Sequence, residues 1–304
     1  MASPALLSPL ASTWKRYKEW AGTACELKSR LDRWRLWTLI LAVMGTVLVT
    51  LGQQIPSILT SLGSQAGTMG KIIGLAGAGA VALSTYFARE ALSTESVQRW
   101  AKCRSAAESM KASTYLYRAG VSPFEGADRD EKLIDRRTAI EETLGGVEML
   151  VRTEESDTAF DPSPLTVEGY CQKRLDDQVQ FYQKRADEYH KKTAALRALV
   201  FWLGAIAVIL GVVSALKPLV IGWTAVIATV TAAISSYVQS QHYQILITTY
   251  QATSSRLQTL RDKWIGGGKA DANRNAFIQS CEDTLALENS AWVIQWSQQK
   301  PASQ

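Results

Sequence analysis

The apolar run after Pro218 carries small and hydroxyl side chains spaced so that they lie on one face of a helix. The steps between Thr224, Ala228, Thr231 and Ser235 are four, three and four residues. Residues at these steps share a face because an α-helix turns once in 3.6 residues. A face of hydroxyls and small groups can line a narrow pore that passes hydrated ions. The stripe therefore predicts a pore wall.

A matching stripe occurs in the first half of the chain, at Gly77, Ala80 and Ser84. In the later run, bulkier residues such as Ile227 and Val230 fall on other faces. The competing interpretation is close helix packing, which small residues permit in membranes and which is the commoner explanation for any single residue. Both interpretations hold if the helices pack around a central axis.

Other chemistry is not indicated. The glycine-rich stretch 74–80 lacks the GxGxxG spacing and lies inside an apolar run. The sequence contains no GxxxxGK[ST], HExxH or GxSxG motif. The four cysteines are far apart and form no Cys/His cluster with metal-ligand spacing. We therefore expect no catalytic residues, no enzyme activity, no cofactor and no metal site.

The stripes belong to two pairs of apolar runs. The first pair covers 36–52 and 70–88, and the second covers 196–238 with Lys217-Pro218 between its halves. Each run is long enough, or nearly so, for a helix that crosses a bilayer. A buried hairpin in a soluble protein is the alternative, but a soluble helix usually keeps a polar face. We predict an all-α membrane protein with four transmembrane helices in two hairpins.

The net charge of +5 comes from basic residues that flank the apolar runs. The hairpin tips carry only Lys71 and Lys217. By the positive-inside rule, both termini and the central region face the cytoplasm of a multi-pass plasma (inner) membrane protein. We expect the lipid bilayer, not nucleic acid, as the partner of these charges. No ionisable residue lies deep in a run, which disfavours a proton-coupled transporter.

Long amphipathic helices are expected on the cytoplasmic side. Apolar residues recur at three- and four-residue steps in the segments 13–35, 100–117, 133–151, 175–196, 246–264 and 277–292. Such spacing is typical of helices that pack on one another. We predict that five residues mediate assembly: Trp100, Met110, Tyr250, Leu257 and Leu260. The acidic residues are interpreted as solvated faces and i,i+4 pairs.

The two halves are repeats of the same order: helix, span, span, helix, loop, helix. We expect a first repeat at 1–151, a linker at 152–169 with two prolines, and a second repeat at 170–304. Each repeat starts inside and has two spans, so the repeats are parallel and imply a pseudo-rotation axis along the membrane normal. A dimer would place four two-span repeats around one axis.

Several motifs carry a resemblance to a known family. Residues 175–182 (LDDQVQFY), the basic helix that follows and the membrane hairpin resemble the DUF4231/SLATT group (SMODS and SLOG-associating two-transmembrane effectors). Phe277-Ile278, Cys281-Glu282 and 288–292 (ENSAW) resemble the tail of that domain. The first half is similar to a diverged copy, with WKRY at 14–17 before its hairpin.

This resemblance implies a bacterial protein that forms pores or perturbs membranes as an effector in nucleotide-triggered defence. Nothing in the chain resembles a nucleotide sensor, so a separate nucleotide-sensing protein would supply the trigger. The first functional hypothesis is a homo-oligomeric membrane pore or cation-permeable channel, as a dimer or a higher oligomer. The alternative is a non-conducting membrane scaffold that recruits a partner through its cytoplasmic helices.

Overall fold

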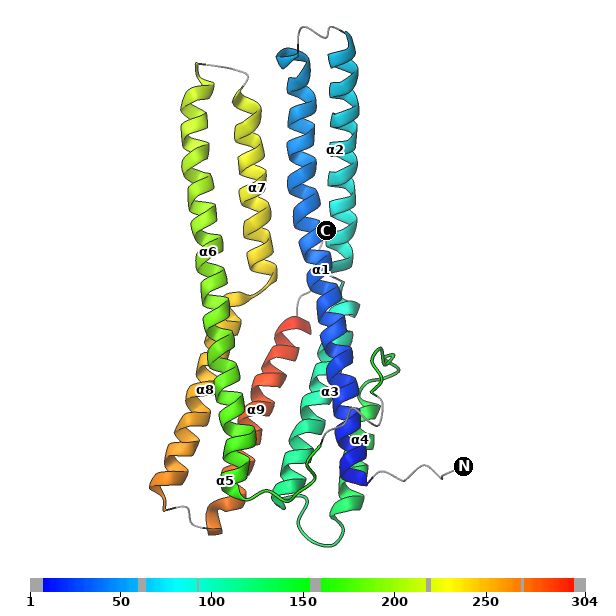
Figure 1. Ribbon diagram of the computed structural model, residues 1–304, viewed down its shortest axis with the longest axis vertical. Coiled ribbons are helices and arrows are strands. Elements are labelled where there is room, and N and C mark those ends of the chain that lie inside the picture. Colours follow the sequence, from blue (N-terminus) through cyan, green and yellow to red (C-terminus); the bar gives the residue numbers. More distant parts are fainter. Residues whose placement is uncertain are drawn as a thin grey trace. The chain divides into compact units, whose positions relative to one another are not determined.

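The computed structural model describes residues 8–59, 64–91, 93–153, 160–216, 220–268 and 271–297, and all regular secondary structure in these ranges is helical (Figure 1). The α-helices are α1 (Pro9–Ile58), α2 (Ser64–Ala91), α3 (Thr94–Ala119), α4 (Arg129–Glu142), α5 (Val167–Tyr170), α6 (Asp176–Ser214), α7 (Ile221–Ser240), α8 (Tyr243–Gly266) and α9 (Arg274–Ser297). A π-helical turn, Cys171–Leu175, joins α5 to α6, and a 3-10 turn, Asp271–Asn273, precedes α9.

Four helical stretches in the described part of the chain are long and apolar enough to cross a membrane. Their apolar segments, the spans, lie in α1, α2, α6 and α7, as expected. Of the exposed large apolar side chains, all but Ile134, Phe181, Ile265 and Leu287 lie in or beside these spans. Exposed apolar surface of this extent needs lipid or a partner. The chain is an all-α membrane protein.

Several predicted boundaries hold, and one does not. The first amphipathic helix runs unbroken into the first span, and α3 stops just before Gly120. The predicted helix 133–151 ends earlier, because α4 stops at Glu142 and the following Gly145 and Gly146 have positive φ angles, which favour glycine. The linker 152–169 stays a prediction; the short helix α5 begins within it, at Val167. Lys217-Pro218 lies outside the described residues.

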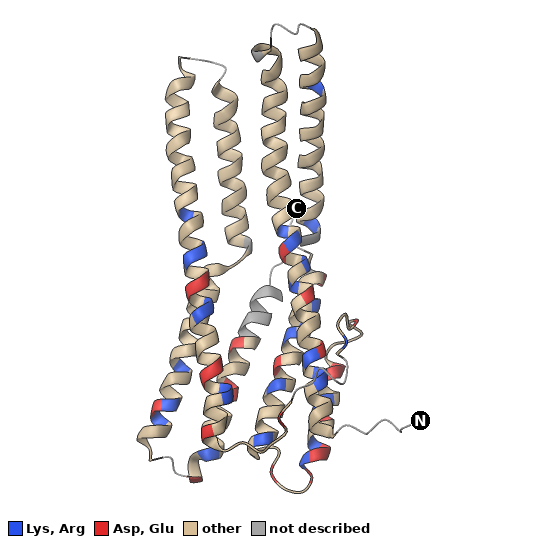
Figure 2. Ribbon diagram, viewed as in Figure 1, with Lys and Arg blue, Asp and Glu red and all other residues tan. Residues whose placement is uncertain are grey.

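Contacts divide the chain into two compact units that cut across the repeats. We call the first unit the polar bundle; it comprises residues up to 29, 94–186 and from 247 onward. The second, the membrane unit, comprises 30–93 and 187–246. Figure 2 shows most charged residues on the helices of the polar bundle, whereas the helices of the membrane unit are largely uncharged. Each unit therefore contains parts of both halves of the sequence.

In the polar bundle, α3 packs against both α4 and α9. Its buried residues include Trp100, Cys103, Ala107 and Met110, at alternating three- and four-residue steps. This is the spacing of a helix that buries one stripe against its neighbours. The hydroxyl of Thr23 on α1 accepts hydrogen bonds from the backbone N–H groups of Leu150 and Val151, both at 3.2 Å, and so fixes the segment after α4.

In the membrane unit, the first hairpin closes through glycine. A Cβ atom placed on Gly77 of α2 would lie 2.7 Å from the carbonyl oxygen of Gly45 on α1. One placed on Gly52 would lie 2.6 Å from the carbonyl oxygen of Gly70. Any side chain at these positions would force the two backbones apart. On each helix the two glycines are seven residues apart: Gly45 and Gly52 on α1, and Gly70 and Gly77 on α2. Both contacts therefore lie on one face of each helix, as in close membrane helix pairs.

Candidate functional site

The hydroxyl stripe of α7 lies away from the core of the membrane unit. The buried side chains of α7 are Val226 and Ile234, and Gly222 on the same side approaches α1. At 100° per residue, Thr224, Ala228, Thr231 and Ser235 are centred roughly 150° from that face. Ala228 is exposed and the three hydroxyl residues are half-buried. This face of α7 is thus only partly covered within one chain, and lipid or another copy of the chain can cover the rest.

The corresponding stripe of α2 lies differently. Gly77 and Ser84 are buried, and Ala80 is half-buried. Gly77 contacts the backbone of α1 at Gly45, and the Ser84 hydroxyl donates to the carbonyl of Val81 at 2.7 Å within its own helix. Within one chain, Gly77 thus serves helix packing. Its predicted place beside a pore stays a prediction, as it does for the α7 residues.

A polar contact joins the two hairpins inside the membrane unit. The indole N–H of Trp223 on α7 donates to the side-chain oxygen of Gln54 on α1 at 2.8 Å. Gln54 is buried, and so is Thr50 one turn earlier, beside which Gly222 packs. Polar side chains in lipid-facing helices are stable when they hydrogen-bond across helices. This contact holds α7 in the orientation that turns its hydroxyl stripe outward.

A buried ion pair lies at the centre of the polar bundle. Arg174, on the π-helical turn, donates from Nε and Nη2 to the two carboxylate oxygens of Glu282 on α9, at 3.0 and 2.9 Å. The side chains of Arg174 and Glu282 are only 1% and 3% exposed. Tyr170 adds a third hydrogen bond to Glu282 at 2.9 Å. Burial by itself would lower the pKa of Arg174, but the carboxylate of Glu282 outweighs it and raises that pKa.

A second buried carboxylate lies further along α9. Glu288 pairs with Arg104 of α3 at 3.5 Å and accepts a hydrogen bond from the hydroxyl of Tyr182 on α6 at 3.2 Å. Burial raises the pKa of Glu288, and Arg104 and Tyr182 offset this only in part. The two pairs join α3, the start of α6 and α9 through charge as well as apolar contact.

These buried pairs correct the interpretation of the acidic residues as solvated. Glu282 and Glu288 are both buried. A signal was present in the sequence: Ile278, Cys281 and Leu285 form an apolar stripe on α9, and Glu282 lies within the same face. A charged residue at a core position of such a stripe indicates a buried partner.

The five residues predicted to mediate assembly lie mainly inside the chain's own core. Trp100, Met110, Tyr250 and Leu257 are buried, and Leu260 is half-buried. The ring of Tyr250 lies 5.3 Å from that of Tyr182, which joins α8 to α6 within one protomer. They pack at helix–helix contacts of one chain, and a role between copies stays a prediction.

Two family descriptions match the chain in tandem. Residues 12–132 match DUF4231, a protein family of unknown function, and residues 170–292 match the SMODS and SLOG-associating 2TM effector domain 1, SLATT_1. No curated protein and no solved structure matches the chain. With its helical spans, the molecule is a membrane-associated protein whose second half matches a two-transmembrane effector domain. More specifically, the chain is a tandem DUF4231/SLATT-like protein, with the DUF4231 region first.

Proposed function

We propose that the protein is a homo-oligomeric membrane pore or cation-permeable channel whose wall is formed by α7. The observation that carries this proposal is the orientation of Thr224, Ala228, Thr231 and Ser235 on the face of α7 opposite Val226 and Ile234. The Thr224 hydroxyl already donates to the carbonyl of Ile221 at 2.7 Å within its own helix. Its oxygen, like those of Thr231 and Ser235, keeps acceptor capacity that lipid cannot use, whereas around an axis these oxygens can contact hydrated ions. A second copy would convert these open faces into a common wall.

The glycine contacts support the same arrangement. The α1–α2 hairpin closes backbone to backbone, so it behaves as a rigid element, and the Trp223–Gln54 hydrogen bond attaches α7 to it. The second hairpin has no such closure at Gly204 and Gly211, where an added Cβ atom would meet nothing within 4 Å. Its surface is therefore available to lipid or to other copies.

The proposal includes a topology and a location. We place both termini and the polar bundle in the cytoplasm of a bacterial plasma membrane, because basic residues flank the spans and are almost absent from the hairpin tips. Ser64 at the start of α2 and Ser163 before α5 are both exposed. A membrane-impermeant thiol reagent added outside cells should label Ser64→Cys and spare Ser163→Cys; the reverse pattern would overturn this topology.

Ion flux from liposomes tests the pore. Thr231→Trp should lower the flux at least tenfold without changing the oligomer's size, because the indole fills the proposed lumen. Thr229→Trp is the matched control, since Thr229 is an exposed threonine of the same helix that lies about 160° away from Thr231 around the helix. Equal flux in the two variants would contradict the α7 wall. A complete absence of flux from wild-type oligomers would favour the non-conducting scaffold.

A further inference from the structure

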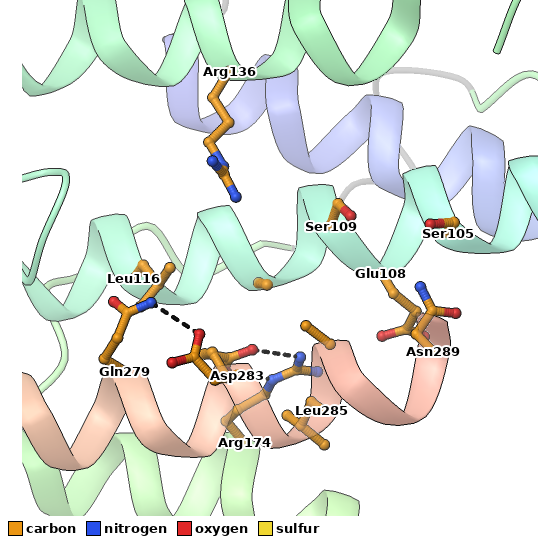
Figure 3. A pocket seen from close by; sticks show the side chains of 13 residues that line it. Ser105, Glu108, Ser109, Leu116, Arg136, Arg174, Gln279, Asp283, Leu285 and Asn289 are labelled. Carbon is orange, nitrogen blue, oxygen red and sulfur yellow. Dashed lines mark hydrogen bonds and ion pairs between the residues drawn. The ribbon is translucent and has the colours of Figure 1, made fainter. Parts of the chain in front are cut away.

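The polar bundle contains a cavity of about 280 Å³ between α3 and α9. Figure 3 shows side chains from both helices lining it, with Arg136 of α4 approaching from the other side. The Arg174–Glu282 pair forms part of the wall. A single water molecule takes about 30 Å³ of liquid volume, so the cavity is large enough for a small organic ligand.

Two buried polar atoms in this wall have no hydrogen-bond partner among the described residues: Nη1 of Arg174 and Oδ1 of Asn289. Arg174 is 1% exposed and Asn289 is 5% exposed. Buried polar groups are nearly always hydrogen-bonded, and an exception calls for a physical explanation such as a ligand. One of these atoms is a donor and the other an acceptor, so a ligand that satisfies both must carry an acceptor and a donor.

The backbone around Arg174 supports a binding role. Arg174 lies on the π-helical turn Cys171–Leu175, and such turns inside α-helices occur frequently at functional sites. Its guanidinium is held by two hydrogen bonds to Glu282 and by the ring of Tyr115, whose centre lies 5.1 Å away. Nη1 is therefore fixed in place before any ligand arrives, which lowers the entropic cost of binding.

The charge of the wall limits the class of ligand. Among the described residues that line the cavity, carboxylates come from Glu108, Glu282 and Asp283, and guanidinium groups come from Arg136 and Arg174. Because Glu282 and Arg174 neutralise each other, Glu108 and Asp283 outnumber Arg136. Glu108 also interacts with Arg104 and Lys111 outside the lining, so the site carries no large net charge. Such a site favours a ligand without net charge over a polyphosphate, and a purely cationic ligand would leave Nη1 of Arg174 unsatisfied.

We propose that this cavity binds a small zwitterion of the amino-acid class. The ligand's carboxylate accepts a hydrogen bond from Nη1 of Arg174, and its amino group donates to Oδ1 of Asn289 and to the Glu108 carboxylate. This binding site stands independently of ion conduction, and its test reads binding alone.

Isothermal titration of the full-length protein in detergent, with each of the twenty standard amino acids, tests the site. Inorganic phosphate and ATP serve as anion probes. At least one amino acid should bind saturably, and Glu108→Gln and Asn289→Leu should each weaken it at least tenfold. Arg174 is left intact because its loss would disturb the buried pair itself. Glu95→Gln is the matched control: Glu95 is an exposed residue of the same helix, and its variant should bind within twofold of wild type.

Three results would overturn the proposal. The first is that no amino acid binds to protein that still unfolds cooperatively. The second is that Glu108→Gln and Glu95→Gln bind equally well. The third is that only phosphate or ATP binds, which would show that the site selects anions and not a zwitterion.

Discussion

In the polar bundle the helices meet through large and charged side chains, whereas in the membrane unit the first hairpin closes through glycine. The bundle buries Arg174 with Glu282 and holds Tyr182 against Tyr250. The membrane unit brings Gly77 against the backbone of Gly45. The surrounding solvent explains the difference, because removing apolar side chains from water is favourable, whereas removing them from lipid is not. Helices in lipid gain instead from close approach and from hydrogen bonds.

The two hairpins of the membrane unit also differ from each other. Among the 18 most apolar consecutive residues of the stretch that contains α6, none is buried. In the corresponding segments of α1 and α2, 17% of the residues are buried. The first hairpin is therefore a packed pair, and α6 presents nearly all of its surface outward. Duplicated sequence order has produced one closed hairpin and one open one.

The largest effect is expected in the polar bundle, from Glu282→Gln. The substitution leaves the guanidinium of Arg174 buried without its counter-charge, and breaking a buried pair in this way costs about 3–5 kcal/mol. Thermal unfolding in detergent, followed by circular dichroism, should show the loss as a lower Tm. An unchanged Tm would mean that Arg174 is solvated, and that charge does not hold this unit together.

Gly77→Leu should produce the largest effect in the membrane unit. The new side chain would enter the backbone of α1, where even a Cβ atom lies 2.7 Å from the nearest atoms. Overpacking of this kind costs typically 1–3 kcal/mol. Gly211→Leu is the matched control, since nothing lies within 4 Å of a Cβ atom there. Equal melting temperatures for the two variants would contradict the distinction between closed and open hairpins.

Trp223→Phe should have a smaller effect on the membrane unit. It removes the indole N–H that donates to Gln54, and hydrogen bonds between membrane helices contribute about 0.6 kcal/mol on average and about 1.7 at most. Trp202→Phe, on the exposed surface of α6, is the control. A loss of stability in the control as large as that in Trp223→Phe would point to the ring rather than the hydrogen bond.

Glu288→Gln should have the smallest effect, because its partner Arg104 is 20% exposed and keeps part of its hydration, and the size of the effect should depend on pH. Because burial raises the pKa of Glu288 in the folded state, folding favours its protonated form. That stabilisation is present below the unfolded value of about 4.3 and is lost as pH rises through the folded pKa. Glutamine imitates the protonated form, so the variant's Tm relative to wild type should be higher at pH 7 than at pH 4. A difference that grows toward pH 4 would contradict this assignment.

The sequence by itself determined the spans, the long helices and the family. Apolar runs without a polar face identify membrane helices almost independently of context, because every backbone polar group in lipid must be satisfied within the helix. The stripe of α3 at Trp100, Cys103, Ala107 and Met110 is predictable for a different reason, because helical periodicity is a local property of the sequence. The motifs at 175–182 and 288–292 pointed to the family that the tandem matches show.

Only the tertiary structure decided which partners those helices meet. A stripe of small residues has the same sequence pattern whether it packs against a neighbouring helix or lies on an open face. In the fold, Gly77 is buried against α1, whereas Ala228 is exposed and Thr231 is only half-buried. Likewise Arg174 reads as one more basic residue before a span, until the fold brings Glu282 within 3 Å across a separation of 108 residues. Long-range pairing depends on how whole helices pack, and local sequence pattern carries little information about that.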